Sequence, residues 1–287
     1  MLLGAHSPPA PYESMAGFHR LETAIGRRLD IVHLFQAWGD RDTAAFRTDW
    51  IEASVADGRR VLLTWEPWAP PAGFEQPGFA LGRIVDGTHD RYVETWASGL
   101  ADIDRPVWLR PMHEMNGTWY PWAGGIAGNT PELYVAGWRH IHGIFRRAGA
   151  TRVRWVWAPN TPDVPVDNRF ERYYPGASYV DVLGLDGYNW GAGAPDHGGW
   201  RSFDEIFSGD LDRIGALGSQ PVWITETASC ADGGDKAAWV RDMMAFVRDR
   251  PRIEAVVWFD VLKERDWRMT VPAEAPARFT AQGSSRA

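Results

Sequence analysis

Short apolar runs rich in β-branched and aromatic residues recur along the chain, and most are followed by a segment with helical spacing. A strand followed by a helix, repeated eight times in 287 residues, predicts an α/β fold of the (β/α)8 barrel type. We expect residues 1–287 to form one domain, with the last few residues as a flexible tail. The eight runs are Leu2 to Ala5, Ile31 to Gln36, Val61 to Trp65, Val107 to Arg110, Val153 to Ala158, Val182 to Leu185, Val222 to Thr225, and Ala255 to Phe259.

The intervening helices differ in how clearly the sequence marks them. Pro131 to Arg147 and Lys236 to Arg248 each carry an apolar stripe, and Thr130 before Pro131 is typical of a helix start. The segment Asp163 to Tyr174 contains several prolines, so we expect at most a weak helix there. The last helix has to be short, near Pro276 to Gln282. The two stripes consist of Leu133, Ala136, Ile141 and Ile144 in the first helix and Val240, Met244 and Val247 in the second.

Charge and hydropathy argue against two kinds of partner. The net charge is -7 and no Lys/Arg-rich run is present, which excludes the electrostatic pattern of a nucleic-acid-binding protein. No apolar stretch reaches the roughly 18 residues of a membrane span. The first residues, Met-Leu-Leu-Gly-Ala-His, are too short for a signal-peptide core, so the protein is cytosolic or has lost a leader. The one cysteine, Cys230, excludes an intrachain disulfide.

Tryptophan is unusually abundant. The chain has 17 Trp beside 8 Tyr and 12 Phe, more indole than core packing normally uses. Many of these rings lie beside Asn, Asp, Glu or Gly at the ends of the apolar runs, where a flat ring can stack on a sugar. Composition therefore favours a carbohydrate ligand.

Two glutamates follow strand runs that are three repeats apart. Glu114 lies in Arg-Pro-Met-His-Glu-Met-Asn-Gly over residues 110–117, and Glu226 lies in Val-Trp-Ile-Thr-Glu-Thr-Ala over residues 222–228. The carboxyl ends of the strands form the active-site face of such a barrel, so both side chains are expected at its mouth. Paired carboxylates are what glycosidic cleavage needs. The alternative, two structural hydrogen bonds at strand ends, is disfavoured because Glu226 stands where an apolar residue is expected if the strand continued, and because both glutamates have aromatic neighbours.

These segments resemble glycoside hydrolase family 26, a clan A family of retaining enzymes dominated by endo-β-1,4-mannanases. Arg-Pro-Met-His-Glu-Met-Asn-Gly with Trp119 and Trp122 is similar to the acid/base segment of the family, and Trp-Ile-Thr-Glu-Thr-Ala-Ser to its nucleophile segment. Similarity continues in Asp-Gly-Tyr-Asn-Trp at 186–190 and in Trp-Phe-Asp at 258–260, followed by Lys263, Asp266 and Trp267. The resemblance spans nearly the whole predicted barrel.

The resemblance implies roles for individual residues. Glu114 would be the acid/base and Glu226 the nucleophile, with carboxyl groups about 5–5.5 Å apart in a retaining enzyme. Tyr188 would hold the nucleophile and Trp258 would be the platform under the reacting sugar. Burial among aromatic rings favours a protonated acid, whereas a tyrosine hydroxyl and an arginine favour an ionised nucleophile. The expected substrate-binding residues are Arg110, His113, Asn116, Trp119, Trp122, Asn160, Tyr188, Trp190, Trp258 and Glu66.

Several candidates have a structural alternative. Glu66, after the third run, either lines a more distant sugar subsite or makes a structural hydrogen bond. Asn160 either contacts a sugar hydroxyl or caps the following turn. Asp260 and Asp266 are expected to brace the last loop.

No metal or other cofactor is expected. No His-Glu-x-x-His motif occurs, and two histidines at 140 and 142 point apart on a helix. A serine nucleophile is excluded in the same way, since no Gly-x-Ser-x-Gly motif is present.

The sequence therefore predicts a retaining endo-β-1,4-mannanase. Action on mixed-linkage β-1,3-1,4-glucan or on xylan is the alternative within the family, and Thr118 in the acid/base loop weakens a mannan-specific reading. A non-catalytic polysaccharide-binding or exopolysaccharide-assembly protein is the alternative from another class, but binding alone would not require both carboxylates. We expect a polysaccharide or oligosaccharide partner, a monomer, and a secreted or cell-surface location reached by a leader outside this chain.

Overall fold

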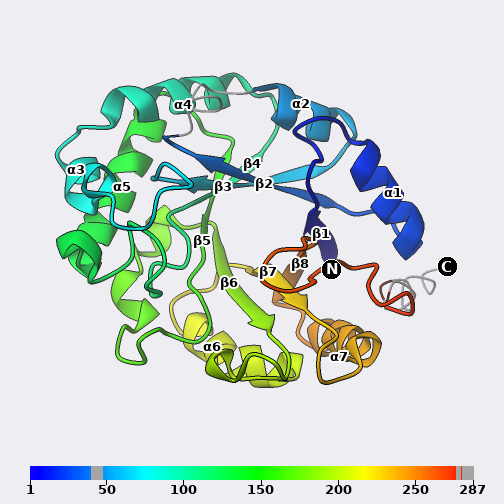
Figure 1. Ribbon diagram of the computed structural model, residues 1–287. Coiled ribbons are helices and arrows are strands. Elements are labelled where there is room, and N and C mark those ends of the chain that lie inside the picture. Colours follow the sequence, from blue (N-terminus) through cyan, green and yellow to red (C-terminus); the bar gives the residue numbers. More distant parts are fainter. Residues whose placement is uncertain (40–47, 276–278, 280–287) are drawn as a thin grey trace.

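A computed structural model describes residues 1–39, 48–275 and 279, and its centre is a closed barrel of eight parallel strands (Figure 1). Each strand pairs with its neighbour in the sequence, and β1 closes the barrel against β8 from Leu2↔Ala255 to His6↔Phe259. The predicted (β/α)8 fold is confirmed. The strands are β1 (Leu2–His6), β2 (Ile31–Ala37), β3 (Arg60–Glu66), β4 (Val107–Pro111), β5 (Val153–Trp157), β6 (Val182–Asn189), β7 (Val222–Ser229) and β8 (Ile253–Phe259).

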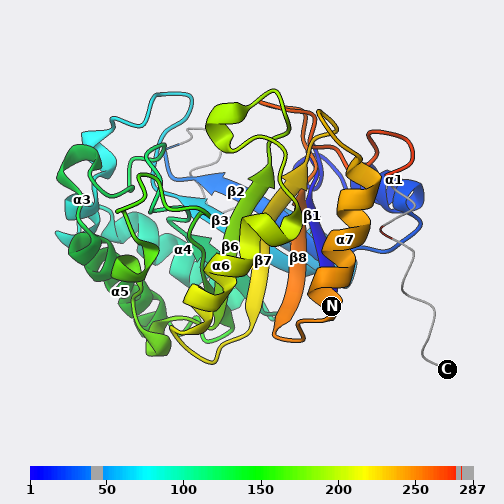
Figure 2. The same ribbon diagram turned by 90° about the horizontal axis from the view of Figure 1, so that it is seen from below.

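Helices surround the barrel, and Figure 2 shows α6 and α7 on the outer side of β6, β7 and β8. The proline-rich segment after β5 forms only two short 3-10 turns, Phe170–Tyr173 and Ala177–Tyr179, as its prolines suggest. The expected last helix lies almost wholly outside the described residues, as does the expected tail. The helices are α1 (Ala16–Ile25), α2 (Thr48–Ala56), α3 (Leu81–Val85), α4 (Asp90–Asp102), α5 (Pro131–Arg147), α6 (Phe203–Gly215) and α7 (Lys236–Arg248).

The helix with the clearest sequence signal, α5, begins as predicted. The Thr130 hydroxyl accepts a hydrogen bond from the Leu133 amide at 3.3 Å, and Pro131 occupies the first turn. Its buried face is centred on Tyr134, Trp138, Ile141, Ile144 and Phe145. Leu133 is therefore at the edge of the buried face rather than in it.

Side chains along each strand point alternately into the barrel and toward the helices, and this alternation produces two apolar layers. Inside the barrel, a small cluster that includes Leu62, Trp223, Ala255 and Val257 fills the end opposite the mouth. The residues between them point outward into a much larger layer under the helices. Successive residues of a strand point alternately into the barrel and outward, and we call the side to which a residue points its parity. Parity therefore also determines which residues at the strand ends reach the mouth.

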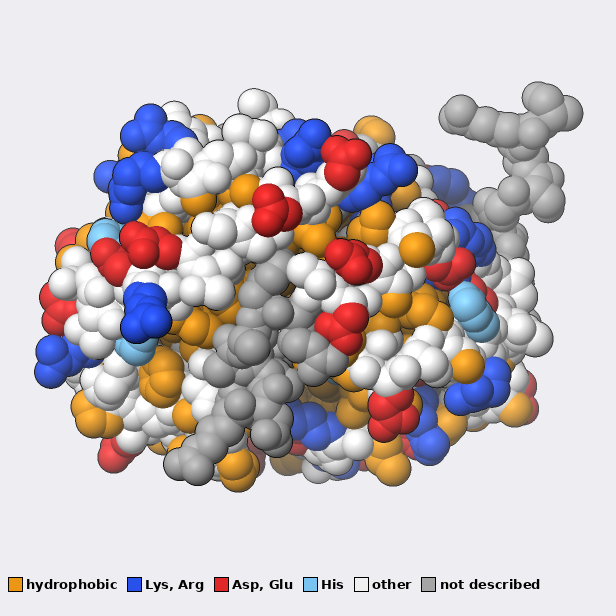
Figure 3. All heavy atoms as spheres, turned by 90° about the horizontal axis from the view of Figure 1, so that it is seen from above, with side chains coloured by type: hydrophobic (Ala, Val, Ile, Leu, Met, Phe, Trp, Pro, Cys, Tyr) orange, Lys and Arg blue, Asp and Glu red, His pale blue; other side chains and the backbone are white. Residues whose placement is uncertain are grey.

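No helix in the described part of the chain is both long and apolar enough to cross a membrane. On the face drawn in Figure 3, acidic and basic side chains of the described residues are interspersed with hydrophobic ones, and no broad basic patch is formed there.

Candidate active site

A β-bulge in β7 directs Glu226 into the barrel mouth. Leu185 of β6 pairs with Ile224, but the next residue, Asp186, pairs with Glu226, so Thr225 is an extra residue in β7. The Thr225 hydroxyl donates to the Asp186 carboxylate at 2.6 Å, which fixes the bulge. Such a bulge changes the direction of the side chain that follows it. Trp223 points inward by parity, and the bulge allows Glu226 to point inward as well.

Glu226 is held by one cation and one hydroxyl. Arg110 Nη2 donates to Glu226 Oε2 at 2.7 Å, and the Tyr188 hydroxyl donates to Oε1. The guanidinium is itself fixed, since Nε donates to the Thr64 hydroxyl at 2.7 Å and Nη1 to Asp186 at 2.5 Å. A buried arginine paired in this way orients the Glu226 carboxylate and places a compensating positive charge beside it.

Glu114 lies just beyond β4 in a different environment. Its backbone has φ of +52° and its amide donates to the Ala158 carbonyl at 2.8 Å, which anchors the residue to the end of β5. The Trp119 indole donates to Glu114 Oε2 at 2.6 Å. Burial, and then the negative charge of Glu226, raise the pKa of Glu114 to about 8. This carboxyl group is therefore protonated at neutral pH.

His113 and the aromatic residues of the same loop form a wall beside Glu114. His113 Nε2 lies 3.1 Å from the Tyr120 hydroxyl, and burial together with Arg110 holds the pKa of the imidazole well below its usual range, so it is neutral. Trp122 stacks on Tyr120 with centroids 4.3 Å apart and donates to the His113 carbonyl at 2.6 Å.

Five of the predicted substrate-binding residues are completely buried, which contradicts direct sugar contact for them. Arg110 and His113 border the two carboxylates, and Trp122 supports Tyr120 from behind. Asn116 is used internally: its amide donates to the Asn160 carbonyl and to Asp163, each at 2.8 Å.

The fifth, Trp258, lies outside the barrel. It packs against Trp239 and Phe279, with centroid distances of 6.0 and 5.2 Å, and its indole donates to the Trp267 carbonyl at 2.6 Å. The prediction of a sugar platform at Trp258 is therefore wrong. The reason is strand parity: Ala255 and Val257 point inward, so Phe259 is the aromatic residue of β8 that reaches the mouth.

Four other predicted residues lie partly exposed at or near the mouth. Trp119 contacts Glu114, and Tyr188 contacts Glu226. Trp190 stacks on His197 with centroids 4.0 Å apart. The Asn160 amide donates to the Pro162 carbonyl at 2.6 Å, so it caps its own turn, which was the structural alternative. Glu66, the remaining one, is buried at the end of β3.

The sequence reasoning missed several residues at the mouth: His6, Phe35, Tyr120, Phe259 and Trp267. His6 stacks on Phe259 at 5.4 Å and contacts Phe35 at 4.7 Å, while Trp267 lies 5.1 Å from Tyr188. Three of them, from β1, β2 and β8, have the inward parity of their strands. That parity was the available signal.

His113, Asp186 and Glu226 offer ligand atoms that lie within 4.8 Å of one another, which is the spacing of a metal site. However, Arg110 donates to both carboxylates. Its guanidinium already supplies the positive charge that a bound cation would bring, so these residues fit an ion-pair network better than a metal centre.

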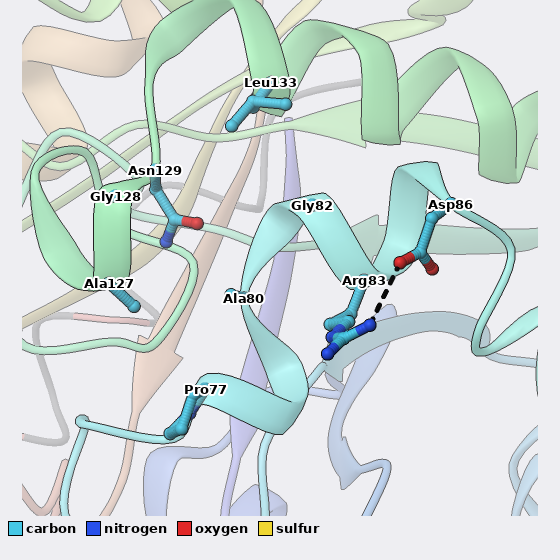
Figure 4. Close-up of a pocket in the computed structure, with 9 residues that line it drawn as sticks. All are labelled: Pro77, Ala80, Gly82, Arg83, Asp86, Ala127, Gly128, Asn129 and Leu133. Carbon is cyan, nitrogen blue, oxygen red and sulfur yellow. Dashed lines mark hydrogen bonds and ion pairs between the residues drawn. The ribbon is translucent and has the colours of Figure 1, made fainter.

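A shallow depression elsewhere has no comparable chemistry. It lies between α3 and the loop before α5 and includes Arg83, Asp86 and Asn129 (Figure 4). Arg83 pairs with Asp86 at 3.3 Å, and the Asn129 side chain bonds to the backbone of Leu81, Pro121 and Ala123. Its polar groups are thus already satisfied by the protein.

The family model described as Glycosyl hydrolase family 26 matches residues 81–240, which include Glu114 and Glu226. The chain belongs to glycosyl hydrolase family 26. Endoglucanase H from Acetivibrio thermocellus is 37% identical over 281 residues, covering 96% of this chain and 30% of that protein. A mannan endo-1,4-beta-mannosidase from Bacillus subtilis is 37% identical over 102 residues, covering 32% of this chain and 26% of that one. The chain thus spans less than a third of either relative.

Solved structures of family 26 enzymes share the fold. An endo-beta-1,4-mannanase from Cellulomonas fimi has a TM-score of 0.72 at 20% identity, covering 99% of this chain and 70% of that one. A beta-mannanase from Bacteroides ovatus has a TM-score of 0.65 at 19% identity, covering 96% and 83% of the two chains. At these identities the likeness establishes the barrel and leaves the substrate to other arguments.

Proposed function

We propose that this family 26 chain is a retaining endo-β-glycanase in which Glu226 is the nucleophile and Glu114 the acid/base. The observation that carries the proposal is the unequal environment of two buried carboxyl groups at one barrel mouth. Glu226 receives hydrogen bonds from a buried guanidinium and a phenol, whereas Glu114 receives one from an indole and has its pKa raised to about 8. Carboxyl groups that differ in this way suit the two roles of glycoside hydrolysis.

In the first step, a carboxylate oxygen of Glu226 attacks the anomeric carbon. The bond from that carbon to the glycosidic oxygen breaks, and the leaving oxygen takes the proton of Glu114. In the second step, Glu114 removes a proton from water, the water oxygen attacks the anomeric carbon, and the bond to Glu226 breaks. Two displacements at the same carbon return the original anomer.

The electrostatics support the change in the role of Glu114 between the steps. The negative charge of Glu226 is the second cause, after burial, of the raised pKa of Glu114. That charge disappears when Glu226 forms an ester with the sugar. The pKa of Glu114 then falls, so the group that acted as an acid becomes able to act as a base.

The mouth favours an uncharged polysaccharide. Four carboxyl groups are buried around it, those of Glu66, Glu114, Asp186 and Glu226. The buried cation among them, Arg110, is already paired with Asp186 and Glu226, so it is not available to bind an acidic sugar. The partly exposed rings of Tyr120, Tyr188 and Phe259 supply the flat apolar surfaces on which a hexose packs.

Between neutral substrates, we propose β-glucan first and β-mannan second. The relative named endoglucanase H matches nearly the whole chain, whereas the mannosidase match covers about a third of it. Mannan, which the sequence resemblance predicts, keeps the support of relatives and fold neighbours that are named mannanases. Because a polysaccharide of this kind is met outside the cell, we also propose that the enzyme acts there.

The test is reducing-end release and product sizing on mixed-linkage glucan, glucomannan, galactomannan and xylan, with Glu226→Ala as the blank. Cleavage of glucan into short oligosaccharides that is lost in the blank would support the proposal, and cleavage of galactomannan alone would reverse the order of substrates. NMR of the first anomer released decides between retention and inversion. Binding to any of these polymers without cleavage would indicate a non-catalytic carbohydrate-binding protein instead.

A further inference from the structure

Glu66 is a buried carboxylate that the mechanism above does not use. It is 6% exposed and ends β3, where Leu62 and Thr64, of the same parity, face the barrel interior. Its side chain therefore points into the mouth. No arginine, lysine or histidine of residues 1–39 and 48–275 forms an ion pair with it.

Burying a carboxylate without an ion-pair partner costs free energy, and Glu66 is buried in this way. Burial raises the pKa of Glu66 to about 7, and the influences of Trp68, Arg110 and Lys263 oppose this shift without cancelling it. Acidic residues that brace loops in this protein are treated differently. Asp163, for example, accepts from Asn116 and from the Phe170 amide and pairs with Arg213 at 2.7 Å. The carboxylate of Glu66 keeps unused acceptor capacity in the described chain.

The surroundings of Glu66 are those of a sugar subsite beside the reacting centre. After burial, the charges of Glu114, Glu66 and Glu226 raise the pKa of Tyr120, so all three carboxyl groups act on that residue. Trp68 meets the edge of Tyr120 with centroids 5.7 Å apart and an interplanar angle of 90°. Glu66 thus lies next to the acid/base loop.

A continuous row of rings extends from there across the neighbouring strands. His113 lies 6.1 Å from Phe35, Phe35 lies 4.7 Å from His6, and His6 stacks on Phe259 at 5.4 Å. The ends of β8, β1, β2 and β4 therefore carry an aromatic surface, with Glu66 of β3 at its side. A hexose packs its apolar face on rings and presents its hydroxyls at the edge.

His6 supplies a second acceptor to the same surface. Its Nδ1 lies 3.0 Å from the His33 carbonyl, which can only accept, so Nδ1 carries the hydrogen. Burial lowers the pKa of His6 to about 4, so the ring is neutral and Nε2 is an acceptor. His6 therefore presents an acceptor at neutral pH, and Glu66 presents only acceptors when it is ionised, above its pKa of about 7.

We propose that Glu66, with His6, forms a subsite for the sugar next to the reacting one, in which both side chains accept hydrogen bonds from hydroxyl groups of a neutral hexose. The inference rests on the proposed function of the chain. Two acceptors select a sugar whose hydroxyl groups at those positions are free to donate, so this subsite sets part of the specificity. The carboxylate is the stronger partner because hydrogen bonds to charged groups are the stronger ones.

The experiment compares Glu66→Ala and Glu66→Gln with the unmodified protein and with Glu75→Ala, a control at an exposed glutamate in the loop after β3. Each protein is assayed on its preferred polysaccharide and on the 2,4-dinitrophenyl β-glycoside of one hexose, which fills only the reacting subsite. Cleavage positions are mapped on an end-labelled hexasaccharide. Circular dichroism and thermal unfolding verify that each variant is folded.

We expect kcat/KM on the polysaccharide to fall about 10- to 100-fold in Glu66→Ala, with a loss at least tenfold smaller on the dinitrophenyl glycoside and with displaced cuts in the hexasaccharide. His6→Ala should displace the cuts in the same direction, and Glu75→Ala should match the unmodified protein. Equal losses on both substrates, or unchanged cuts, would overturn the subsite. Failure of the unmodified protein to cleave any polysaccharide would instead count against the proposed function, so the two failures are distinguishable.

Discussion

At the scale of single residues, the chemistry of this barrel comes from a contrast between two glutamates. Arg110 and Tyr188 surround Glu226 with donors, and each donor stabilises a negative charge. Glu114 has burial, a nearby negative charge and one indole donor, and the first two favour the neutral acid. In the proposed mechanism, the same kind of side chain therefore serves as the nucleophile at one position and as the proton donor at the other.

The contrast predicts different kinetics for the two alanine variants. Glu226→Ala should lose turnover on every substrate, because no covalent intermediate can form. Glu114→Ala should lose polysaccharide cleavage by about 10²–10⁴-fold yet still form the intermediate from 2,4-dinitrophenyl glycosides, whose leaving group needs no proton. Pre-steady-state release of dinitrophenol measures that step. Equal residual activity of the two variants on the dinitrophenyl glycoside would contradict the assignment of Glu226 as nucleophile and Glu114 as acid/base.

The pH dependence of kcat/KM should follow the proton on Glu114. Since its pKa is raised to about 8, the acid form is lost and activity falls as pH rises through that value. The Trp119 hydrogen bond lowers this pKa, so Trp119→Phe should move the alkaline limb to higher pH. Profiles between pH 5 and 10 on a soluble oligosaccharide measure the shift. If the alkaline limb of the profile does not move in Trp119→Phe, then the limb does not report the ionisation of Glu114.

The sequence predicted the site residues that the chemistry of the reaction requires, but it did not predict those whose position depends on packing. The two glutamates and Tyr188 stand in segments whose residue types fit only a few reactions, and the fold brings them together. Trp258 stands beside Phe259, and the sequence offers two aromatic residues for one position. The family resemblance predicted Trp258 at the mouth, but the inward parity of β8 places Phe259 there and buries Trp258 under α7.

At the scale of elements, the site depends on how closely α6 lies on β6. Gly187 stands between Asp186 and Tyr188 on β6. A Cβ built there would be 2.7 Å from the Thr161 methyl group and 2.9 Å from Ile206 Cγ2 of α6. Glycine therefore permits the close approach of helix and strand, and β6 in turn places Tyr188 against Glu226.

Substitution of this glycine should affect both stability and activity. Gly187→Ala should destabilise the fold by about 1–3 kcal/mol through overpacking, and should lower kcat by displacing Tyr188. The matched control is Gly209→Ala on α6, an exposed helical glycine with no atom within 4 Å of the added Cβ. That variant should be stabilised by about 0.5–1 kcal/mol. Urea unfolding of the pair measures both values, and equal stabilities would refute the packing argument.

Elements were predictable in proportion to their local signals. The N-cap at Thr130 and the apolar stripe fixed α5, whereas Asp163 to Tyr174 lacks a stripe and forms only short turns. The bulge at Thr225 had no sequence signal at all. It depends on the side-chain bond from Thr225 to Asp186, two residues 39 positions apart in the chain.

At the scale of the whole molecule, barrel closure joins residues that are farthest apart in the sequence. The β1–β8 pairing brings His6 beside Phe259, and the Ser7 hydroxyl donates to Asp260 at 2.7 Å. Alternation of strands and helices predicts that such a closure exists. Strand parity marks His6, Phe35 and Phe259 as inward-facing, but the order of strands and helices does not predict that these rings and His113 form one continuous row.

Closure of the barrel also buries carboxyl groups, and the free-energy cost of burying them depends on pH. Burial raises the pKa of Glu66 from 4.5 to about 7, so the folded state binds its proton more tightly than the unfolded state does. Its contribution to stability is therefore fully present below pH 4.5 and is lost as pH rises through about 7. Glu66→Gln keeps the shape of the protonated side chain and removes the titration.

The free energy of unfolding of Glu66→Gln, relative to the unmodified protein, should therefore increase by roughly 2–3 kcal/mol between pH 5 and pH 8.5. Urea unfolding at the two pH values measures this difference, and Glu75→Gln, at an exposed glutamate, should show none. A gain of the same size at both pH values would mean that the glutamine is better packed and that no proton is involved. No gain at either would mean that Glu66 is paired in solution, and this would also remove the reason for assigning it to a sugar. A variant that is more stable at alkaline pH yet poorer on polysaccharide is the combination expected of a carboxylate retained for binding at the expense of stability.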